Sequence, residues 1–340
     1  YIGDAGVAPI QPGNENLTWE NTWTTNLAFH FGFWSRLNAD FELYAKRTTD
    51  MLMSVPLSYA QSNGYGYMWD NVGAMVNLGA EINVNATVLQ IRDFSWNLNA
   101  NVSYNHNRIV ELYNGVQEYE LSNTNTKLVV GHPLGEFYIN RYAGVNPANG
   151  DALWYDKDGN ITNELRDEDK VMIGKTYHAP WQGGFGTNLS WKGLSLSFLL
   201  TSSVGNDIYN ASKIEMIGMY SAGNQIKDAL RRWRIPGQIT DIPKAGELAN
   251  LRASTRWIED GSYLKVKNIT LSYDITHPAL KKANINRIQP YITLDNMITF
   301  TNYTGYDPEM SQYTSATSMG IDWGTYPCVK TVLFGVNVEF

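Results

Sequence analysis

Tyrosine and tryptophan side chains in the long polar stretches of this sequence are its best candidates for ligand contact. Each presents an apolar ring with a hydrogen-bonding group, which suits stacking on a sugar ring or packing against another protein. The candidates are Tyr65, Tyr67, Trp69, Trp154, Tyr313, Trp323 and Tyr326. The alternative is that each of these rings packs within its own connection.

One acidic stretch has the alternating oxygen donors of a calcium loop, at Asp156, Asp158 and Asn160. However, Ile161 stands where such a loop needs glycine, and Asp167 stands where it needs glutamate. Asp-Gly-Asn is also ordinary turn chemistry. We therefore predict a turn here, and no metal or other cofactor for the chain.

The sequence contains no motif of a known catalytic machinery. It has no Gly-x-Ser-x-Gly, no His-Glu-x-x-His and no phosphate-binding glycine loop. The single cysteine, Cys328, and five scattered histidines follow no ligand spacing. A net charge of −7 argues against nucleic acid as a partner. We predict a protein that is not an enzyme.

Nine segments alternate apolar and polar residues with a period of two, which predicts β-strands with one apolar and one polar face. They are 26–33, 37–46, 76–86, 94–105, 183–191, 194–201, 264–275, 288–300 and 329–340. Most are longer than the ~5–6 residues usual in soluble strands. Every second residue of 94–105 is Ser or Asn. The fold class indicated is all-β, an antiparallel transmembrane barrel with a polar lumen.

The connections between these segments alternate in length. Short turns are expected at 34–36, 92–93 and 192–193, and an intermediate one at 277–285. Residues 135–145 and 152–155 are predicted as short strands inside a long connection, and the apolar phase slips near Asn268, which indicates a bulge. Short periplasmic turns and long outside loops are typical of outer-membrane barrels. The aromatic residues beside the short turns fit an aromatic girdle: Phe33, Trp34, Phe94, Trp96 and Trp191.

The last strand has an apolar face that suits barrel closure and assembly. Its outward residues include Phe334, Val336, Val338 and Phe340. About nine strands starting outside cannot close a bacterial single-chain barrel, and an open sheet in lipid leaves backbone groups unpaired. We therefore expect residues 1–340 to be the C-terminal part of a larger barrel. The alternatives are a secreted carbohydrate-binding β-sandwich module and a surface barrel acting as an adhesin.

Several short motifs, in order along nearly the whole chain, resemble SusC/RagA-type TonB-dependent transporters. They are Asn16-Leu17-Thr18-Trp19-Glu20, residues 44–52, residues 71–79, Phe94-Ser95-Trp96, residues 131–138, residues 262–271, Gly305-Tyr306-Asp307-Pro308-Glu309, and the terminal Phe-Gly-x-Asn-x-x-Phe. Each motif alone is weak, and the resemblance lies in their order and spacing.

The resemblance implies a protein of the bacterial outer membrane, in contact with its lipid, whose barrel has about 22 strands and a plugged lumen. Its TonB box, plug and first strands are absent here, so the N-terminal portion of the same transporter and the TonB complex would be partners. A SusD-type surface lipoprotein would cover the outside loops. The cargo of such transporters is typically oligosaccharide, and in some members peptide.

Replacing Phe340 with Ala should lower the amount of assembled barrel in the outer membrane, because it removes apolar surface from the closing strand. The measurement is the heat-modifiable fraction on gels of membrane extracts. Wild-type levels of the assembled form would contradict the prediction.

Overall fold

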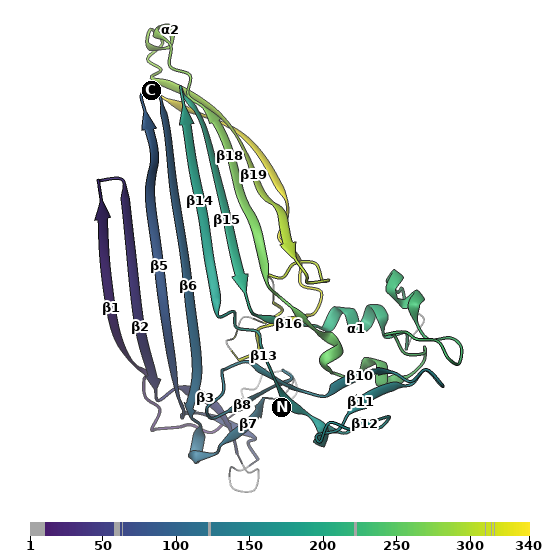
Figure 1. Cartoon of the computed structure of the whole chain (residues 1–340). Helices are drawn as coiled ribbons and strands as arrows, with labels where there is room; N and C mark the ends of the chain where they lie inside the picture. The colour runs from purple at the N-terminus through teal and green to yellow at the C-terminus, as the bar shows by residue number, and fades with distance from the viewer. Residues whose placement is uncertain are drawn as a thin grey trace, which may run out of the picture.

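The computed structural model describes residues 11–57, 62, 64–121, 124–220, 223–309, 311–313, 315 and 317–340. Nine antiparallel strands within these residues form one sheet, which stands as a tall curved wall in Figure 1. In spatial order they are β1 (Asn21–Phe33), β2 (Leu37–Thr49), β5 (Ala74–Ile91), β6 (Phe94–Glu111), β14 (Trp181–Trp191), β15 (Leu194–Val204), β18 (Tyr263–Tyr273), β19 (Arg287–Thr301) and β21 (Thr331–Glu339).

All short connections lie at one end of this wall, and all long ones at the other (Figure 1). The short ones are three tight turns and the segment that contains α2 (Pro278–Lys281). The strand order follows the chain order, as consecutive hairpins require. The predicted strands and their alternating connections are confirmed. No helix among the described residues is long and apolar enough to cross a membrane.

One face of the wall is apolar from edge to edge. The register places Phe29 opposite Phe41, Phe41 opposite Ile82, and Ile82 opposite Val102. On the far side Ile292 lies opposite Phe334. Side chains on this face are extensively exposed, which a protein tolerates over so large an area only where lipid or another protein covers it.

The other face is polar and carries rows of amides. Asn85 lies opposite both Asn38 and Asn99, and Asn105 Nδ2 donates to Asn77 Oδ1 at 3.1 Å. Such side chains hydrogen-bond readily to one another and to water. The polar lumen face predicted from the alternation is therefore present in the structure.

Glycines on the polar face make room for tyrosine rings from the neighbouring strand. The Tyr44 ring lies across Gly79, and the Tyr291 ring lies across Gly335, so that a Cβ at either glycine would overlap the ring. Tyr44 Oη then reaches one strand further and donates to Asn105 Oδ1 at 3.0 Å. A bulge interrupts the register of β18 between Val266 and Asn268, as predicted.

The long connections contain small sheets and short helices. The strands are β3 (Leu52–Pro56), β4 (Tyr67–Asn71), β7 (Glu118–Leu121), β8 (Thr126–Val129), β9 (Glu136–Ile139), β10 (Arg141–Val145), β11 (Ala152–Tyr155), β12 (Ile161–Thr162), β13 (Val171–Thr176), β16 (Asp207–Asn210), β17 (Ile258–Asp260) and β20 (Ile321–Asp322). The α-helix is α1 (Ala211–Ile217), and the 3-10 turns are Tyr113–Gly115, Asp167–Asp169, Lys227–Arg231, Leu248–Leu251 and Thr255–Trp257. The strands predicted at 135–145 and 152–155 thus lie outside the nine-stranded sheet, as expected.

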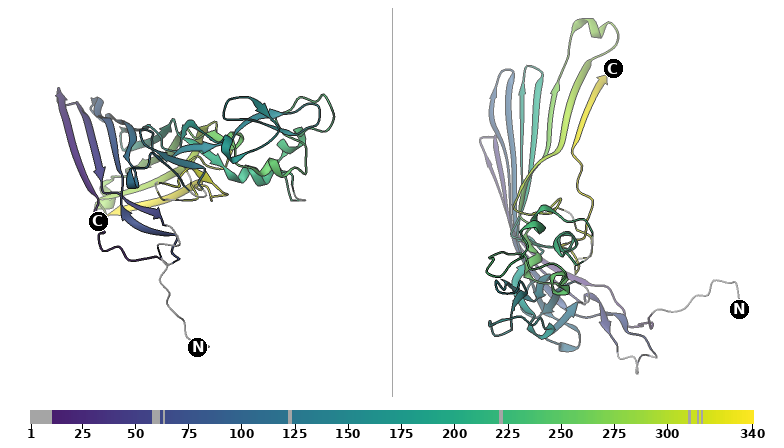
Figure 2. Two further views of the ribbon diagram at one scale, coloured as in Figure 1. Left: turned by 90° about the horizontal axis from the view of Figure 1, so that it is seen from below. Right: turned by 90° about the vertical axis from the view of Figure 1, so that its right-hand side faces the viewer.

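Three of these connections share one hydrophobic core. Phe137 and Tyr177 come from the connection between β6 and β14, Trp257 from that between β15 and β18, and Ile321 from that between β19 and β21. All four side chains are buried. The connections therefore pack into one body, which projects sideways from the end of the wall in Figure 2.

Replacing Gly79 with Ala should destabilise the sheet by about 1–3 kcal/mol, because the new methyl group overpacks against the Tyr44 ring. The double variant Gly79→Ala/Tyr44→Ala removes the overlap and should recover part of the loss. The measurement is the temperature at which the folded band disappears on gels. Equal temperatures for the wild type and the single variant would contradict the proposed overlap.

Candidate binding site at the loop end of the sheet

The predicted ligand-contacting aromatics have different surroundings in the structure. Tyr67 and Trp69 lie on β4 and are 39% and 46% exposed. Tyr65 is half-buried. The three predicted aromatics in the last long connection are exposed: Tyr313, Trp323 and Tyr326.

The prediction of ligand contact has to be corrected for Trp154. It is only 3% exposed, and its ring meets the ring of Tyr142 edge to face, with centroids 5.5 Å apart. It lies on β11 together with buried Ala152. The indole therefore packs its own connection and has no free face to offer a cargo molecule.

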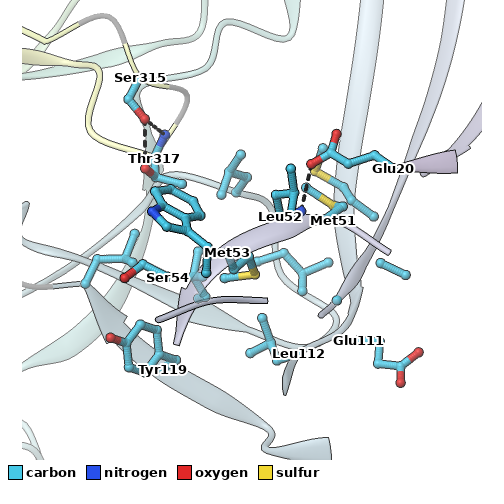
Figure 3. Close-up of a pocket in the computed structure, with 18 of the residues that line it drawn as sticks. Glu20, Met51, Leu52, Met53, Ser54, Glu111, Leu112, Tyr119, Ser315 and Thr317 are labelled. Atoms are coloured by element: carbon cyan, nitrogen blue, oxygen red, sulfur yellow. Dashed lines mark hydrogen bonds between the residues drawn. The ribbon is translucent and has the colours of Figure 1, made fainter. Parts of the chain in front are cut away.

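A cavity of about 750 Å³ lies beside Tyr67 and Trp69 (Figure 3). Three methionines contribute to its lining, and its polar groups include the side chains of Glu20, Ser54 and Glu111. The remaining lining comes from β3, the ends of β5 and β6, the strands β7 and β8, and the last long connection. The lining residues outside the aromatic pair include Glu20, Met51, Met53, Met75, Leu112, Tyr119, Ser315 and Thr317.

The β3–β4 hairpin is tied to the segment that precedes β1. Asn71 Nδ2 donates to the carbonyl oxygens of Thr18 and Asp50, each at 2.8 Å. The Thr18 backbone N–H donates back to Asn71 Oδ1 at 2.6 Å. The Leu52 N–H donates to Glu20 Oε1 at 2.8 Å, a bond drawn in Figure 3. These bonds fix the hairpin beside the cavity.

The floor of the cavity belongs to a second hydrophobic cluster. Ile109 and Leu112 at the end of β6 are buried against Leu128 and Leu134. Met53 and Met75 pack against the same cluster. Methionine has a flexible, polarisable side chain that adapts to partners of different shape. This side of the cavity is therefore suited to contact with apolar groups of varied shape.

The last long connection closes the other side. Ser315 and Thr317 line the cavity opposite Leu112 and Tyr119 in Figure 3, and their hydroxyl oxygens are 3.0 Å apart. The predicted candidate Tyr313 belongs to the same connection but does not line the cavity. Sequence analysis thus found two lining aromatics and missed the methionines, because methionine carries no signal of ligand contact.

A buried ion pair anchors the last connection to the wall. The Lys265 side chain, only 1% exposed, rises from the polar face of β18. Its Nζ lies 3.0 Å from Asp307 Oδ1 and 2.6 Å from Glu309 Oε2. Lys267 Nζ lies 3.2 Å from the same Glu309 oxygen. Two of the motifs that carry the family resemblance therefore meet here, a contact that sequence reasoning did not anticipate.

Asp307 also orders the backbone around it. It accepts from the N–H of Glu309 at 3.0 Å and from the N–H of Cys328 at 3.1 Å. Burial alone raises the pKa of the Asp307 carboxyl, but these N–H groups and the Lys265 ammonium outweigh it and lower the pKa overall. The pKa of Glu309 is lowered in the same way, with burial opposed by Lys265 and Lys267.

The carboxylates of the ion-pair cluster are already compensated by a lysine. Asp307, Glu309 and Cys328 each bring a potential ligand atom to within 4.8 Å of the others. The Lys265 ammonium already lies between the two carboxylates and supplies the compensating charge.

The segment considered for calcium is a turn, as predicted. Asp156 Oδ1 accepts from the Asn160 N–H at 2.8 Å, and Asp156 Oδ2 accepts from Asn160 Nδ2 at 3.1 Å. Asp158 is exposed. Each Asp156 oxygen already has a hydrogen-bond donor from within the turn.

A tyrosine joins the connection between β6 and β14 to the last long connection at a second point. The Tyr177 ring lies over Gly135, which has φ +83°, and against Gly320, which has φ +79°. Both conformations favour glycine, and a Cβ at either position would overlap Tyr177. Gly135, within the motif 131–138, therefore serves a close approach inside its own connection, and Gly320 serves one between two connections.

Three of the candidate closing residues lie on the apolar face of β21, and Phe340 directly follows the strand. Phe334, Val336, Val338 and Phe340 are all exposed. β21 is an edge of the nine-stranded sheet, as is β1. Closure against another strand stays a prediction.

Comparison with known proteins places the chain in a family. A model of the family described as "TonB dependent receptor-like, beta-barrel" matches residues 3–286. TonB-dependent receptor P3 of Formosa agariphila is 29% identical over 370 residues, covering 100% of this chain and 36% of that protein. TonB-dependent receptor SusC of Bacteroides thetaiotaomicron is 28% identical over 364 residues, covering 100% of this chain and 34% of that protein.

A solved structure is similar along the whole chain. It is described as "Structure of the RagAB peptide transporter", and the match has a TM-score of 0.88 and 30% sequence identity. The match covers 100% of this chain and 38% of that one. The chain thus spans about a third of the length of the curated relatives it matches.

Replacing Lys265 with Met should release the last connection, because it leaves the buried Asp307 carboxylate unpaired, at a cost of about 3–5 kcal/mol. The matched control is Lys267→Met, whose side chain is 36% exposed and whose pair is worth about 1 kcal/mol or less. Limited proteolysis of intact cells would measure cleavage within 302–330. Equal cleavage of both variants would contradict the anchoring role.

Proposed function

Because the chain belongs to the TonB-dependent receptor-like β-barrel family, we propose that the complete protein imports an oligomeric nutrient across the outer membrane. Outer-membrane location follows from the family and agrees with the prediction from the sequence. The named relatives are receptors and transporters, which agrees with the prediction that the protein is not an enzyme. The 340 residues would supply the C-terminal part of the barrel, and the N-terminal portion would supply the plug and the remaining strands.

Peptide is the cargo class that the site supports best. The observation that carries it is the methionine-lined cavity beside Tyr67 and Trp69. A peptide offers apolar side chains of varied shape, which adaptable methionines can accommodate. The similarity to the structure described as a RagAB peptide transporter, with a TM-score of 0.88, supports the same choice.

Oligosaccharide is the second candidate, and a separate observation favours it. Tyr313, Trp323 and Tyr326 hold their rings out from the last long connection. Exposed aromatic rings of this kind can stack on the C–H faces of sugars. The two cargo classes would therefore use different parts of the loop end.

The proposed partners of the importer would contact different parts of the transporter. A SusD-type lipoprotein would cover the long connections, where cargo is captured. The TonB complex would act on the N-terminal portion, and no residue of this chain is assigned to that contact. The polar face of the wall, with its Asn rows, would line the wet path around the plug.

Replacing Met53 with Glu should lower peptide uptake at least roughly tenfold, because it places a further carboxylate against the hydrophobic cluster at the floor of the cavity. The control is Met319→Glu, since Met319 is exposed and does not line the cavity. Uptake of fluorescent peptides and of labelled oligosaccharides would be measured in cells with and without TonB.

Loss of peptide uptake in the Met53 variant alone would support peptide cargo. Uptake that does not require TonB would contradict import of the proposed kind. Oligosaccharide uptake that depends on Trp323 and Tyr326 but not on Met53 would replace peptide with the second candidate.

A further inference from the structure

Every short connection of the wall carries an exposed basic side chain. Arg36 follows β1, Arg92 follows β5, and Lys192 follows β14. The connection between β18 and β19 carries Lys281 and Lys282 at and beside α2. We call these five residues the basic edge. They lie along the end of the wall opposite the long connections (Figures 1 and 2).

The basic edge is not neutralised by the protein. Within the described part of the chain, none of its five residues has a carboxylate within 4.0 Å. Three carboxylates lie nearby. Asp93 follows Arg92 in its turn and is exposed, while Asp274 and Glu339 both pair with Arg287, at 3.5 and 3.2 Å.

The charge of this edge contrasts with that of the molecule. The whole chain has a net charge of −7. At the loop end the buried or half-buried lysines Lys213, Lys244 and Lys265 are each held by carboxylates, whereas exposed cations such as Lys227 and Arg234 are not, among the residues that the structure describes. This acidic protein therefore places five cations without a carboxylate partner among the described residues on its short connections.

The basic edge adjoins the border of the apolar face. Trp34, 90% exposed, lies within the turn that contains Arg36. Trp191, 56% exposed, precedes Lys192, whose Nζ lies 5.6 Å from the Trp191 ring centroid. Tryptophan rings are enriched at the level where acyl chains give way to headgroups, and long basic side chains extend from that level toward phosphate and water.

We propose that the basic edge binds the phosphate groups of anionic phospholipids in the periplasmic leaflet. The occupant follows from charge complementarity and from continuity with the apolar face, since one phospholipid presents both acyl chains and a phosphate. Each cation near such a surface contributes roughly a fivefold gain in binding. The five together hold the barrel in register with the leaflet. The proposal requires outer-membrane location but no particular cargo.

The test uses the complete protein in nanodiscs or detergent micelles that contain phosphatidylethanolamine and phosphatidylglycerol. The variant replaces Arg36, Arg92, Lys192, Lys281 and Lys282 with Gln. A matched control replaces two arginines and three lysines of the loop end, Arg232, Arg234, Lys157, Lys227 and Lys330, with Gln. Both variants remove five positive charges, and native mass spectrometry counts the phosphatidylglycerol that co-purifies.

The expected result is a loss of phosphatidylglycerol enrichment of at least roughly tenfold in the basic-edge variant and little change in the control. A third variant, with Arg36→Lys, Arg92→Lys, Lys192→Arg, Lys281→Arg and Lys282→Arg, should keep the enrichment. Equal losses in the first two variants would overturn the proposal, as would loss of lipopolysaccharide instead of phosphatidylglycerol. If the first variant fails to assemble, the wild type alone tests the proposal. Equal co-purification of phosphatidylglycerol and phosphatidylcholine with the wild type would overturn the proposal.

Discussion

Hydrocarbon offers no partner to a backbone N–H or C=O, so every residue that crosses it has to hydrogen-bond within the protein. The long strands meet this constraint by pairing with both neighbours over most of their length, as β5 does with β2 and β6. The constraint also dictates the side chains. With the backbone satisfied, one face can be apolar from Phe29 to Phe334 while the other carries rows of Asn.

The two ends of the strands answer to different environments. At one end the chain turns back at once, with Trp34 and Trp191 at the border of the apolar face. At the other end long connections build a body of their own, with a hydrophobic core around Phe137 and Trp257. Ion pairs such as Lys265 with Asp307 then tie this body to the wall. The wall thus carries a folded body at one end and short turns at the other.

Sequence alternation predicted most of the wall, because a strand is the regular structure that places every second residue from Phe94 to Asn105 on the same face. The connections were harder, because their contacts join distant residues. Lys265 and Asp307 are 42 positions apart, and neither residue type indicates its partner. Trp154 carried a usable signal, since it alternates with Ala152 in a short strand and both are buried. No pattern in the sequence around Met51, Met53 and Met75 indicates that these residues line a cavity.

The shared core of the long connections has an evolutionary consequence. Surface loops usually diverge independently of one another, which lets a scaffold acquire new specificities one loop at a time. Here Phe137, Trp257 and Ile321 belong to different connections yet fill the same interior. A change of size at one position has to be matched in another connection. Exchanging ligand specificity between related proteins therefore requires all three connections to be replaced together.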